Sequence, residues 1–197
     1  MEGARNTPLS HHGFVDIAMR FETNRIVFDR LKTLKLDQCY LAAGSLFQVI
    51  WNAQSGQTLG SGIKDLDVFY FDDTDLSWEA ENAVIERAKV LFHDIEMSVD
   101  IKNQARVHLW YKERFGFDME PLVSSKAGIE SFLIACTCVG IDCATGELYA
   151  PDGLGDLQAG QLRMNPRNPK PSLFLEKAAD YKSRWPWLTI VSKEAAL

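Results

Sequence analysis

The sequence predicts an α/β domain, with a small mixed sheet flanked by helices and a C-terminal helix and hairpin region. Short apolar runs that are typical of strands alternate with amphipathic helical stretches over residues 14–115. Such alternation is typical of a sheet covered by helices. A chain of 197 residues with 46% hydrophobic residues can also bury one sizeable core.

The first elements are a helix, a strand and a second helix. Apolar residues recur at helical spacing over residues 14–34, and we expect this helix to break near Asn24. A short apolar strand at 39–43 stops at Gly44, and a helix begins at Ser45. The Gly- and Ser-rich stretch 54–62 then predicts a mobile loop.

The middle of the chain predicts two more strands, each followed by a helix. Residues 65–71 form a strand, and Ser77 caps a helix with glutamates in its first turn. A strand at 97–101 leads into a helix at 103–115. The buried stripe of that helix is expected to contain Ala105, Leu109 and Trp110 or Phe115.

Helix and hairpin signals follow in the last part of the chain. A helix is expected at 124–135, a hairpin over 138–150 and a final helix at 173–182. We divide the chain into a core of residues 1–120 and an extension of residues 121–197, packed together as a single compact unit. The four cysteines are interpreted as reduced thiols, and Cys136 to Cys138 as part of an apolar strand rather than a zinc site.

Composition limits the classes of partner. The net charge of -6 argues against a surface built mainly to bind polyanions. Basic residues interleaved with Trp110 and Tyr111 leave nucleic-acid binding possible, but Glu113 dilutes their charge, so this reading is not favoured. No apolar run is long enough to span a bilayer, and residues 1–10 lack the features of a leader. We therefore expect a cytoplasmic protein that does not contact a membrane.

Two carboxylates at alternate strand positions give the sharpest functional signal. Asp65 and Asp67 project to the same face of their strand, where they repel each other unless a cation lies between them. Oxygen ligands favour Mg2+ or Mn2+. If the next strand is a neighbour, Asp100 adds a third carboxylate, and three carboxylates can hold two metal ions. The plainer alternatives are a solvated strand start for the pair and a turn or cap for Asp100.

A phosphate site is expected beside these carboxylates. Gly44 permits close backbone approach, and Ser45 with the following helix start offers hydrogen-bond donors. Lys64 adds positive charge next to the carboxylates. Gly-Ser before a helix is a weak signal alone, and it gains weight from the Asp-Leu-Asp strand that follows.

These motifs resemble the polymerase-β-type nucleotidyltransferase superfamily. The stretches 103–110 (NQARVHLW), 150–157 (APDGLGDL) and 185–188 (WPWL) are similar to a bacterial nucleotidyltransferase-like family of that superfamily. The resemblance covers about residues 40–188. Two departures are a long interval between Ser45 and Asp65, and Asp152 where a larger apolar residue is expected.

The resemblance implies roles for the candidate residues. Asp65 and Asp67 would bind catalytic metals, and Asp100 would complete the set and assist deprotonation of an acceptor hydroxyl. Gly44 and Ser45 would contact the nucleotide phosphates.

Two residues of the helix after the third strand are further nucleotide-binding candidates. Arg106 and His108 could steer a triphosphate or the acceptor, although an exposed surface position explains them equally well.

The predicted function is metal-dependent transfer of a nucleoside monophosphate from an NTP to an unknown hydroxyl, with release of pyrophosphate. Two alternatives stay open: a noncatalytic nucleotide-binding or interaction protein of the same fold, and a metal-dependent phosphohydrolase.

Overall fold

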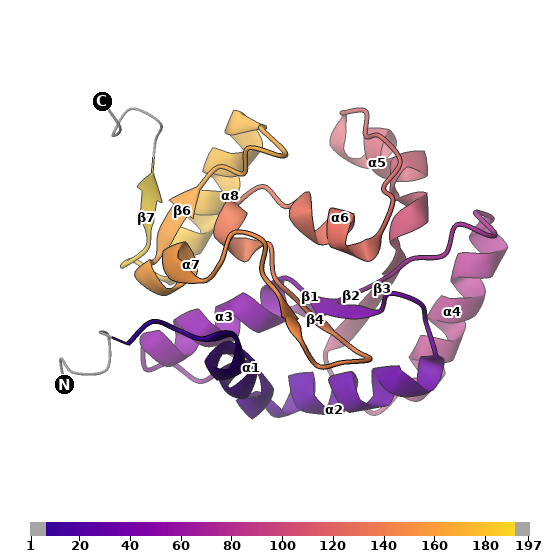
Figure 1. The fold of residues 1–197 in the computed structure, drawn as a ribbon, viewed down its shortest axis with the longest axis horizontal. Coiled ribbons are helices and arrows are strands. Elements are labelled where there is room, and N and C mark those ends of the chain that lie inside the picture. Colours follow the sequence, from indigo (N-terminus) through magenta and orange to yellow (C-terminus); the bar gives the residue numbers. More distant parts are fainter. Residues whose placement is uncertain (1–6, 192–197) are drawn as a thin grey trace.

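A five-stranded mixed sheet forms the centre of the computed structural model, which describes residues 7–191. The strand order is β3-β2-β1-β4-β5, with β2 and β3 parallel and the other neighbours antiparallel. Helices α1 to α4 lie on one side of this sheet and α6 on the other (Figure 1). The predicted fold class is confirmed.

The element bounds follow the predicted alternation. The strands are β1 (Tyr40–Ala42), β2 (Asp65–Tyr70), β3 (Ser98–Asn103), β4 (Gly140–Asp142), β5 (Leu148–Tyr149), β6 (Gln161–Arg163) and β7 (Thr189–Val191). The helices are α1 (His11–Arg20), α2 (Glu22–Leu31), α3 (Gly44–Gln54), α4 (Trp78–Leu91), α5 (Val107–Phe115), α6 (Ser125–Glu130), α7 (Gly155–Ala159) and α8 (Pro171–Arg184), with 3-10 turns η2 (Lys32–Leu34), η3 (Gln104–Arg106) and η4 (Ala135–Thr137). Strands β6 and β7 pair in parallel as a separate small sheet.

The first predicted helix is two helices, and the break lies at Phe21 rather than near Asn24. Phe21 has an extended backbone between α1 and α2. Asn24 lies inside α2, fully buried, and its Nδ2 donates to the carbonyls of Ala18 (3.0 Å) and Ser45 (2.8 Å). This side chain therefore ties both N-terminal helices to the start of α3.

The loop at 54–62, predicted to be mobile, has defined anchors. The Nδ2 of Asn52 donates to the carbonyls of Leu59 (2.8 Å) and Ser61 (2.9 Å). Gly60 lies directly against the ring of Phe21. A buried amide inside the preceding helix thus organises a loop whose own composition indicates none of these contacts.

The segment after α6 differs most from its prediction. The helix expected at 124–135 ends at Glu130, and the cysteine stretch forms η4 instead of a strand. The Nδ2 of Asn165 donates to the carbonyls of Glu130 (2.7 Å) and Phe132 (2.6 Å). These long-range hydrogen bonds replace the ones that would continue the helix.

The predicted core and extension share the main sheet. Strand β4 comes from residues 121–197, yet it pairs directly with β1 of the core. The outermost residues of both predicted parts, 1–6 and 192–197, lie outside the described residues. Within the described chain, no helix combines the length and apolarity needed to cross a membrane.

An aromatic cluster fastens the C-terminal helix α8 to α3. The ring of Trp51 lies 5.3 Å from that of Trp185 and 5.5 Å from that of Tyr181, edge to face in both cases. The indole Nε1 of Trp185 donates to Asn52 Oδ1 at 3.0 Å. Trp185 belongs to the WPWL motif, so that motif anchors the helix that approaches the site described below.

We expect Gly160→Ala to lower the free energy of unfolding more than Gly153→Ala. Both glycines have positive φ values (69° and 68°), which cost an alanine about 1–2 kcal/mol. Only at Gly160 would the added Cβ also meet a side chain, that of Trp187, whereas the space beside Gly153 is open. Urea unfolding of both variants measures the difference, and equal losses would contradict the tight packing of Trp187.

Candidate active site

Strand β2 divides its side chains between two environments. Leu66 and Val68 are fully buried in the main core. Asp65 and Asp67 alternate with them and therefore project to the opposite face, as does Phe69. The predicted same-face placement of the two carboxylates follows from this regular strand.

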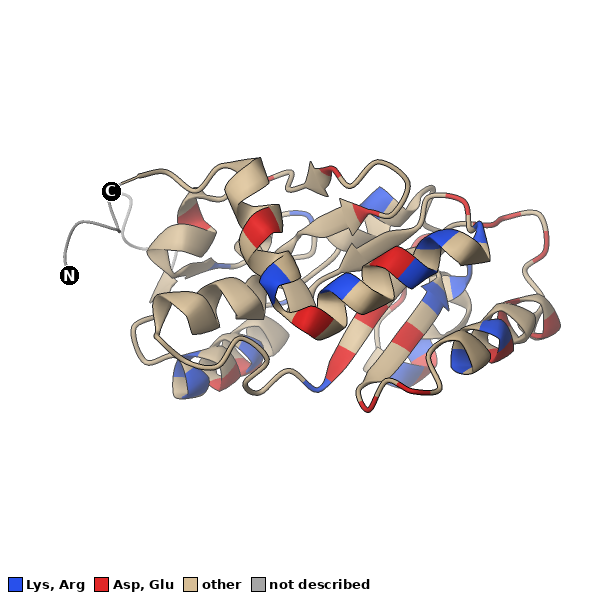
Figure 2. Ribbon diagram, turned by 90° about the horizontal axis from the view of Figure 1, so that it is seen from below, with Lys and Arg blue, Asp and Glu red and all other residues tan. Residues whose placement is uncertain are grey.

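Strand β3 adds a third carboxylate and a lysine on the same face. Asp100 is the register partner of Asp67, and Lys102 is the partner of Phe69. Register partners in neighbouring strands lie side by side, so the acidic segments of the two strands adjoin (Figure 2). The predicted adjacency of these strands is thus observed.

Asp100 is not free to act as a third ligand in this structure. Its carboxylate forms an ion pair with Lys102. Among residues 7–191, no three His, Cys, Asp or Glu side chains are grouped closely enough to hold a metal ion. The expected three-carboxylate cluster is therefore not formed, and the role of Asp100 as a metal ligand stays a prediction.

Electrostatic strain is concentrated at Asp67. Burial, followed by the neighbouring charge of Asp65, raises the pKa of Asp67 to about 6, and Asp100 acts in the same direction. The ammonium groups of Lys102 and Lys177 oppose this shift. A cation beside Asp67 thus relieves the repulsion among these carboxylates.

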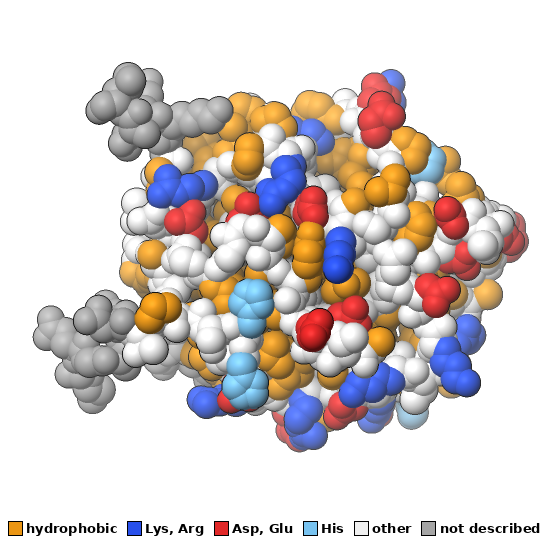
Figure 3. Space-filling view, viewed as in Figure 1, with side chains coloured by type: hydrophobic (Ala, Val, Ile, Leu, Met, Phe, Trp, Pro, Cys, Tyr) orange, Lys and Arg blue, Asp and Glu red, His pale blue; other side chains and the backbone are white. Residues whose placement is uncertain are grey.

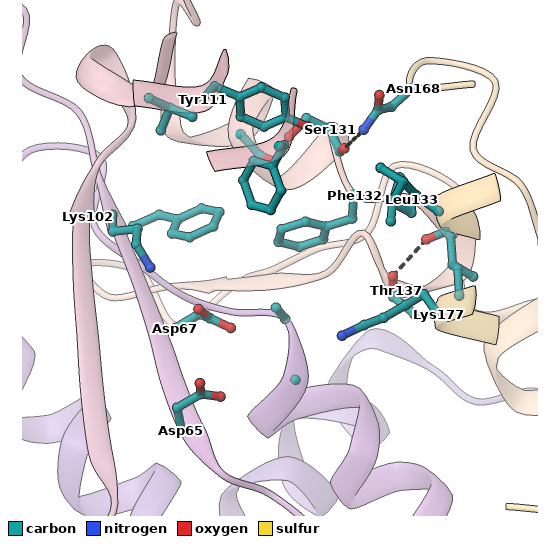
Figure 4. Close-up of a pocket in the computed structure, with 18 of the residues that line it drawn as sticks. Asp65, Asp67, Lys102, Tyr111, Ser131, Phe132, Leu133, Thr137, Asn168 and Lys177 are labelled. Atoms are coloured by element: carbon teal, nitrogen blue, oxygen red, sulfur yellow. Dashed lines mark hydrogen bonds between the residues drawn. The ribbon is translucent and has the colours of Figure 1, made fainter. Parts of the chain in front are cut away.

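The carboxylates face a cavity of about 770 Å³. Asp65, Asp67, Gly44 and Lys64 all line it, which brings four of the predicted site residues together. In Figure 4, the Nζ atoms of Lys102 and Lys177 point toward Asp67 from opposite sides. The volume is within the range of about 300–1,000 Å³ that is usual for small-molecule sites.

Ser45 differs from its neighbour Gly44, because it does not line the cavity. Its side chain is fully buried, and its Oγ has no hydrogen-bond partner among residues 7–191. On α3 the cavity face is formed by Gly44, Phe47 and Gln48, which are spaced three and four residues apart. A contact between Ser45 and a phosphate therefore stays a prediction.

Arg106 does not occupy the predicted nucleotide-binding position. Its side chain is 9% exposed and forms a buried ion pair with Glu81 of α4, while its Nε donates to the Leu76 carbonyl at 2.9 Å. Glu81 Oε1 also accepts from the backbone N–H of Asn103 at 2.8 Å. Arg106 thus joins the end of β3 to α4 and does not line the cavity, and its direct role in binding the nucleotide stays a prediction.

His108 also lies outside the cavity wall, with its Nδ1 buried and unpartnered. On α5 the cavity wall is formed by Val107, Trp110, Tyr111, Arg114 and Phe115, and His108 is not among them. The predicted buried stripe was also wrong in part, because Leu109 is 55% exposed.

Three residues that the sequence did not indicate contribute to the cavity. Phe132 and Lys177 come from segments far from β2 in the chain. For Tyr111, the sequence suggests only nucleic-acid binding. In Figure 4, Tyr111 and Phe132 lie opposite the carboxylates. No local sequence signal identifies Lys177, because only the packing of α8 against α3 brings it to the site.

The departure at Asp152 has a structural explanation. Asp152 accepts three hydrogen bonds from Arg167, at 2.9 Å from Nη2 and at 3.1 and 3.2 Å from Nη1. The Nε of Arg167 lies 3.7 Å from Glu130, immediately before the cavity-lining segment. Asp152 thus supports the wall of the cavity through Arg167.

Charge is mixed on the face shown in Figure 3, where basic and acidic side chains intersperse with apolar ones. Nonspecific nucleic-acid binding needs clustered positive charge, and this face does not provide it.

The mixed sheet, the tight turn at Ala43 before α3 and the paired aspartates of β2 together define a nucleotidyltransferase-type α/β domain. A solved structure described as revealing a CCA-adding enzyme head domain aligns with 96% of this chain and 100% of its own chain, at a TM-score of 0.73 and 22% identity. At this identity the match shows the fold. A comparison with curated proteins found no match.

The model of a nucleotidyltransferase family matches residues 29–190, and the chain belongs to that family. The match includes every predicted site residue.

Proposed function

We propose that this protein transfers a nucleoside monophosphate from an NTP to a hydroxyl acceptor, with the help of Mg2+ or Mn2+, and releases pyrophosphate. The observation that carries the proposal is the pairing of Asp65 and Asp67 on one face of β2, beside a cavity that Lys177 also lines. Membership of a nucleotidyltransferase family supports the reaction class.

The residues present suit a divalent ion. Mg2+ commonly binds through one or two carboxylates, with water and substrate phosphates completing its shell. Asp65 and Asp67 supply two carboxylates, and the raised pKa of Asp67 reflects burial first and then repulsion from Asp65, which positive charge would relieve. When bound, the ion would polarise the phosphoryl oxygens and neutralise charge that develops during transfer.

The protein residues position the reactants. Lys177 and Lys64 line the cavity and offer positive charge to the outer phosphates. The acceptor oxygen forms a bond to the α-phosphorus as the bond to the pyrophosphate oxygen breaks, and the proton of the hydroxyl leaves to a nearby base. Our proposed base is Asp100, which adjoins Asp67 but does not line the cavity in this structure, so it must first be released by Lys102.

The test is incubation of the purified protein with α-labelled NTPs and Mg2+ or Mn2+ over a panel of hydroxyl acceptors. A labelled adduct with release of pyrophosphate supports the proposal. Labelled nucleoside monophosphate without an adduct would identify a phosphohydrolase instead. Metal-dependent binding without any turnover over the panel would identify a noncatalytic nucleotide-binding protein.

We expect Lys102→Met to strengthen Mn2+ binding several-fold. The ammonium group of Lys102 pairs with Asp100 and lowers the repulsion at Asp67, so it competes with a divalent ion for the same carboxylates. Titration with Mn2+, followed by electron paramagnetic resonance, measures the free ion. The exposed Lys112 of α5 pairs with Asp118 outside the cavity wall, so Lys112→Met is a matched control. Equal Mn2+ affinity in wild type and Lys102→Met would contradict this competition.

A further inference from the structure

One end of the cavity is built from aromatic rings. The rings of Phe69 and Phe132 lie 5.8 Å apart, and those of Tyr111 and Phe115 lie 4.7 Å apart. All four residues line the same cavity as the carboxylates. These rings come from β2, α5 and the segment after α6, so separate parts of the fold converge on an apolar end of the site.

This aromatic end begins close to the carboxylates. Phe69 follows Asp67 by two residues on the same face of β2, which corresponds to roughly 7 Å along the strand. In a nucleotide, only a ribose separates the α-phosphate from the base. A triphosphate held at the carboxylates would therefore bring its base to these rings.

Four polar side chains of the wall donate hydrogen bonds to the main chain. Thr137 Oγ1 donates to the Ile134 carbonyl at 2.7 Å, and Ser131 Oγ donates to the Gly128 carbonyl at 2.7 Å. Asn168 Nδ2 donates to the Ser131 carbonyl at 2.5 Å, and Gln104 Nε2 approaches the Lys102 carbonyl at 3.4 Å. These hydrogen bonds use side-chain donors to hold the wall, and the flat ring surfaces beside them supply its apolar contact area.

We infer that the aromatic end, which includes Phe132, binds the base of the nucleotide by stacking and with little discrimination among bases. Stacking is tolerant of sequence because every base presents a π-face. The inference rests on the proposed function and assigns the second half of the same site. It predicts that ATP, GTP, CTP and UTP bind within about tenfold of one another.

Lys177 contributes at the other end of the cavity, and Arg114 at the aromatic end. Lys177 lies beside the carboxylates and outside the ring cluster, so it would contact phosphates rather than the base (Figure 4). Arg114 lies over the rings of Trp110 (5.9 Å) and Phe115 (5.5 Å), where it adds positive charge to the stacking surface. Base and phosphate contacts can therefore be separated by mutation.

The experiment is calorimetric titration of the full chain with ATP and, separately, with inorganic tripolyphosphate, both in the presence of Ca2+ to limit turnover. We expect Phe132→Leu to weaken ATP binding about tenfold and to leave tripolyphosphate binding unchanged. Lys177→Met should weaken the binding of both ligands. Phe132→Tyr keeps a ring at this position and should bind ATP like wild type.

Phe117→Leu is the matched control, because Phe117 is 43% exposed and does not line the cavity. Urea unfolding of each variant shows whether it is folded. An equal ATP affinity for wild type and a folded Phe132→Leu would overturn the inference, as would ATP binding no tighter than tripolyphosphate. If Phe132→Leu affected only the KM of the acceptor, the ring cluster would belong to the acceptor. If neither ligand bound the wild-type protein, the proposed function itself would fail.

Discussion

Asp67→Asn is expected to lower nucleotidyl transfer by on the order of 10²–10³-fold while the protein stays folded. Asparagine keeps the size of the side chain but removes the charge that would hold the divalent ion. Burial and the charge of Asp65 raise the pKa of Asp67 to about 6, so the folded protein disfavours the ionised form. The neutral substitution should therefore leave the free energy of unfolding unchanged or raise it.

The measurement pairs initial rates with urea unfolding of the same preparation. Asp73→Asn is the matched control, since Asp73 is exposed just beyond β2 and does not line the cavity. It should retain wild-type activity. Full activity in both Asp67→Asn and Asp65→Asn would eliminate the proposed metal site.

Arg106→Met is expected to lower the free energy of unfolding by about 3–5 kcal/mol, because it leaves the buried Glu81 without its partner. The side chains of this pair are 9% and 6% exposed, so solvent cannot replace the lost ion pair. Lys89 and Glu86 form an exposed ion pair on α4, the helix that carries Glu81. Lys89→Met should therefore lower the free energy of unfolding by less than about 1 kcal/mol.

Chemical unfolding of both variants tests this difference. The nucleotide affinity of the folded fraction of Arg106→Met distinguishes a structural role of Arg106 from a role in binding the nucleotide. If stability were unchanged and nucleotide affinity fell, Arg106 would contact the nucleotide after all.

Local rules predicted the strands that position the site. Alternation along β2 placed Asp65 and Asp67 on one face, and the cap at Ser77 correctly marked the start of α4, where its side chain accepts from Ala80 N at 3.2 Å. These features depend only on neighbours in sequence. The early end of α6 depends instead on Asn165, which is 35 residues from Glu130 and has no local signature.

The candidate site was predictable only where its residues share one element. Phe69 could have been included by the same alternation that selected Asp67. The sequence makes Arg106 a candidate to bind substrate, because it does not show that Arg106 forms an ion pair with Glu81 of another helix. Lys177 could not be placed without knowing that α8 packs on α3 through Trp51 and Trp185.

The pairing of Trp185 with Asn52 has a consequence for biosynthesis. These residues are 133 positions apart in the sequence. Beside them, Arg184 Nη1 donates to Gln48 Oε1 at 2.9 Å, across 136 positions. A nascent chain on the ribosome cannot close these loops until residue 185 has been made. Contacts of this span slow folding, so the half-made polypeptide exposes the apolar surface that chaperones bind.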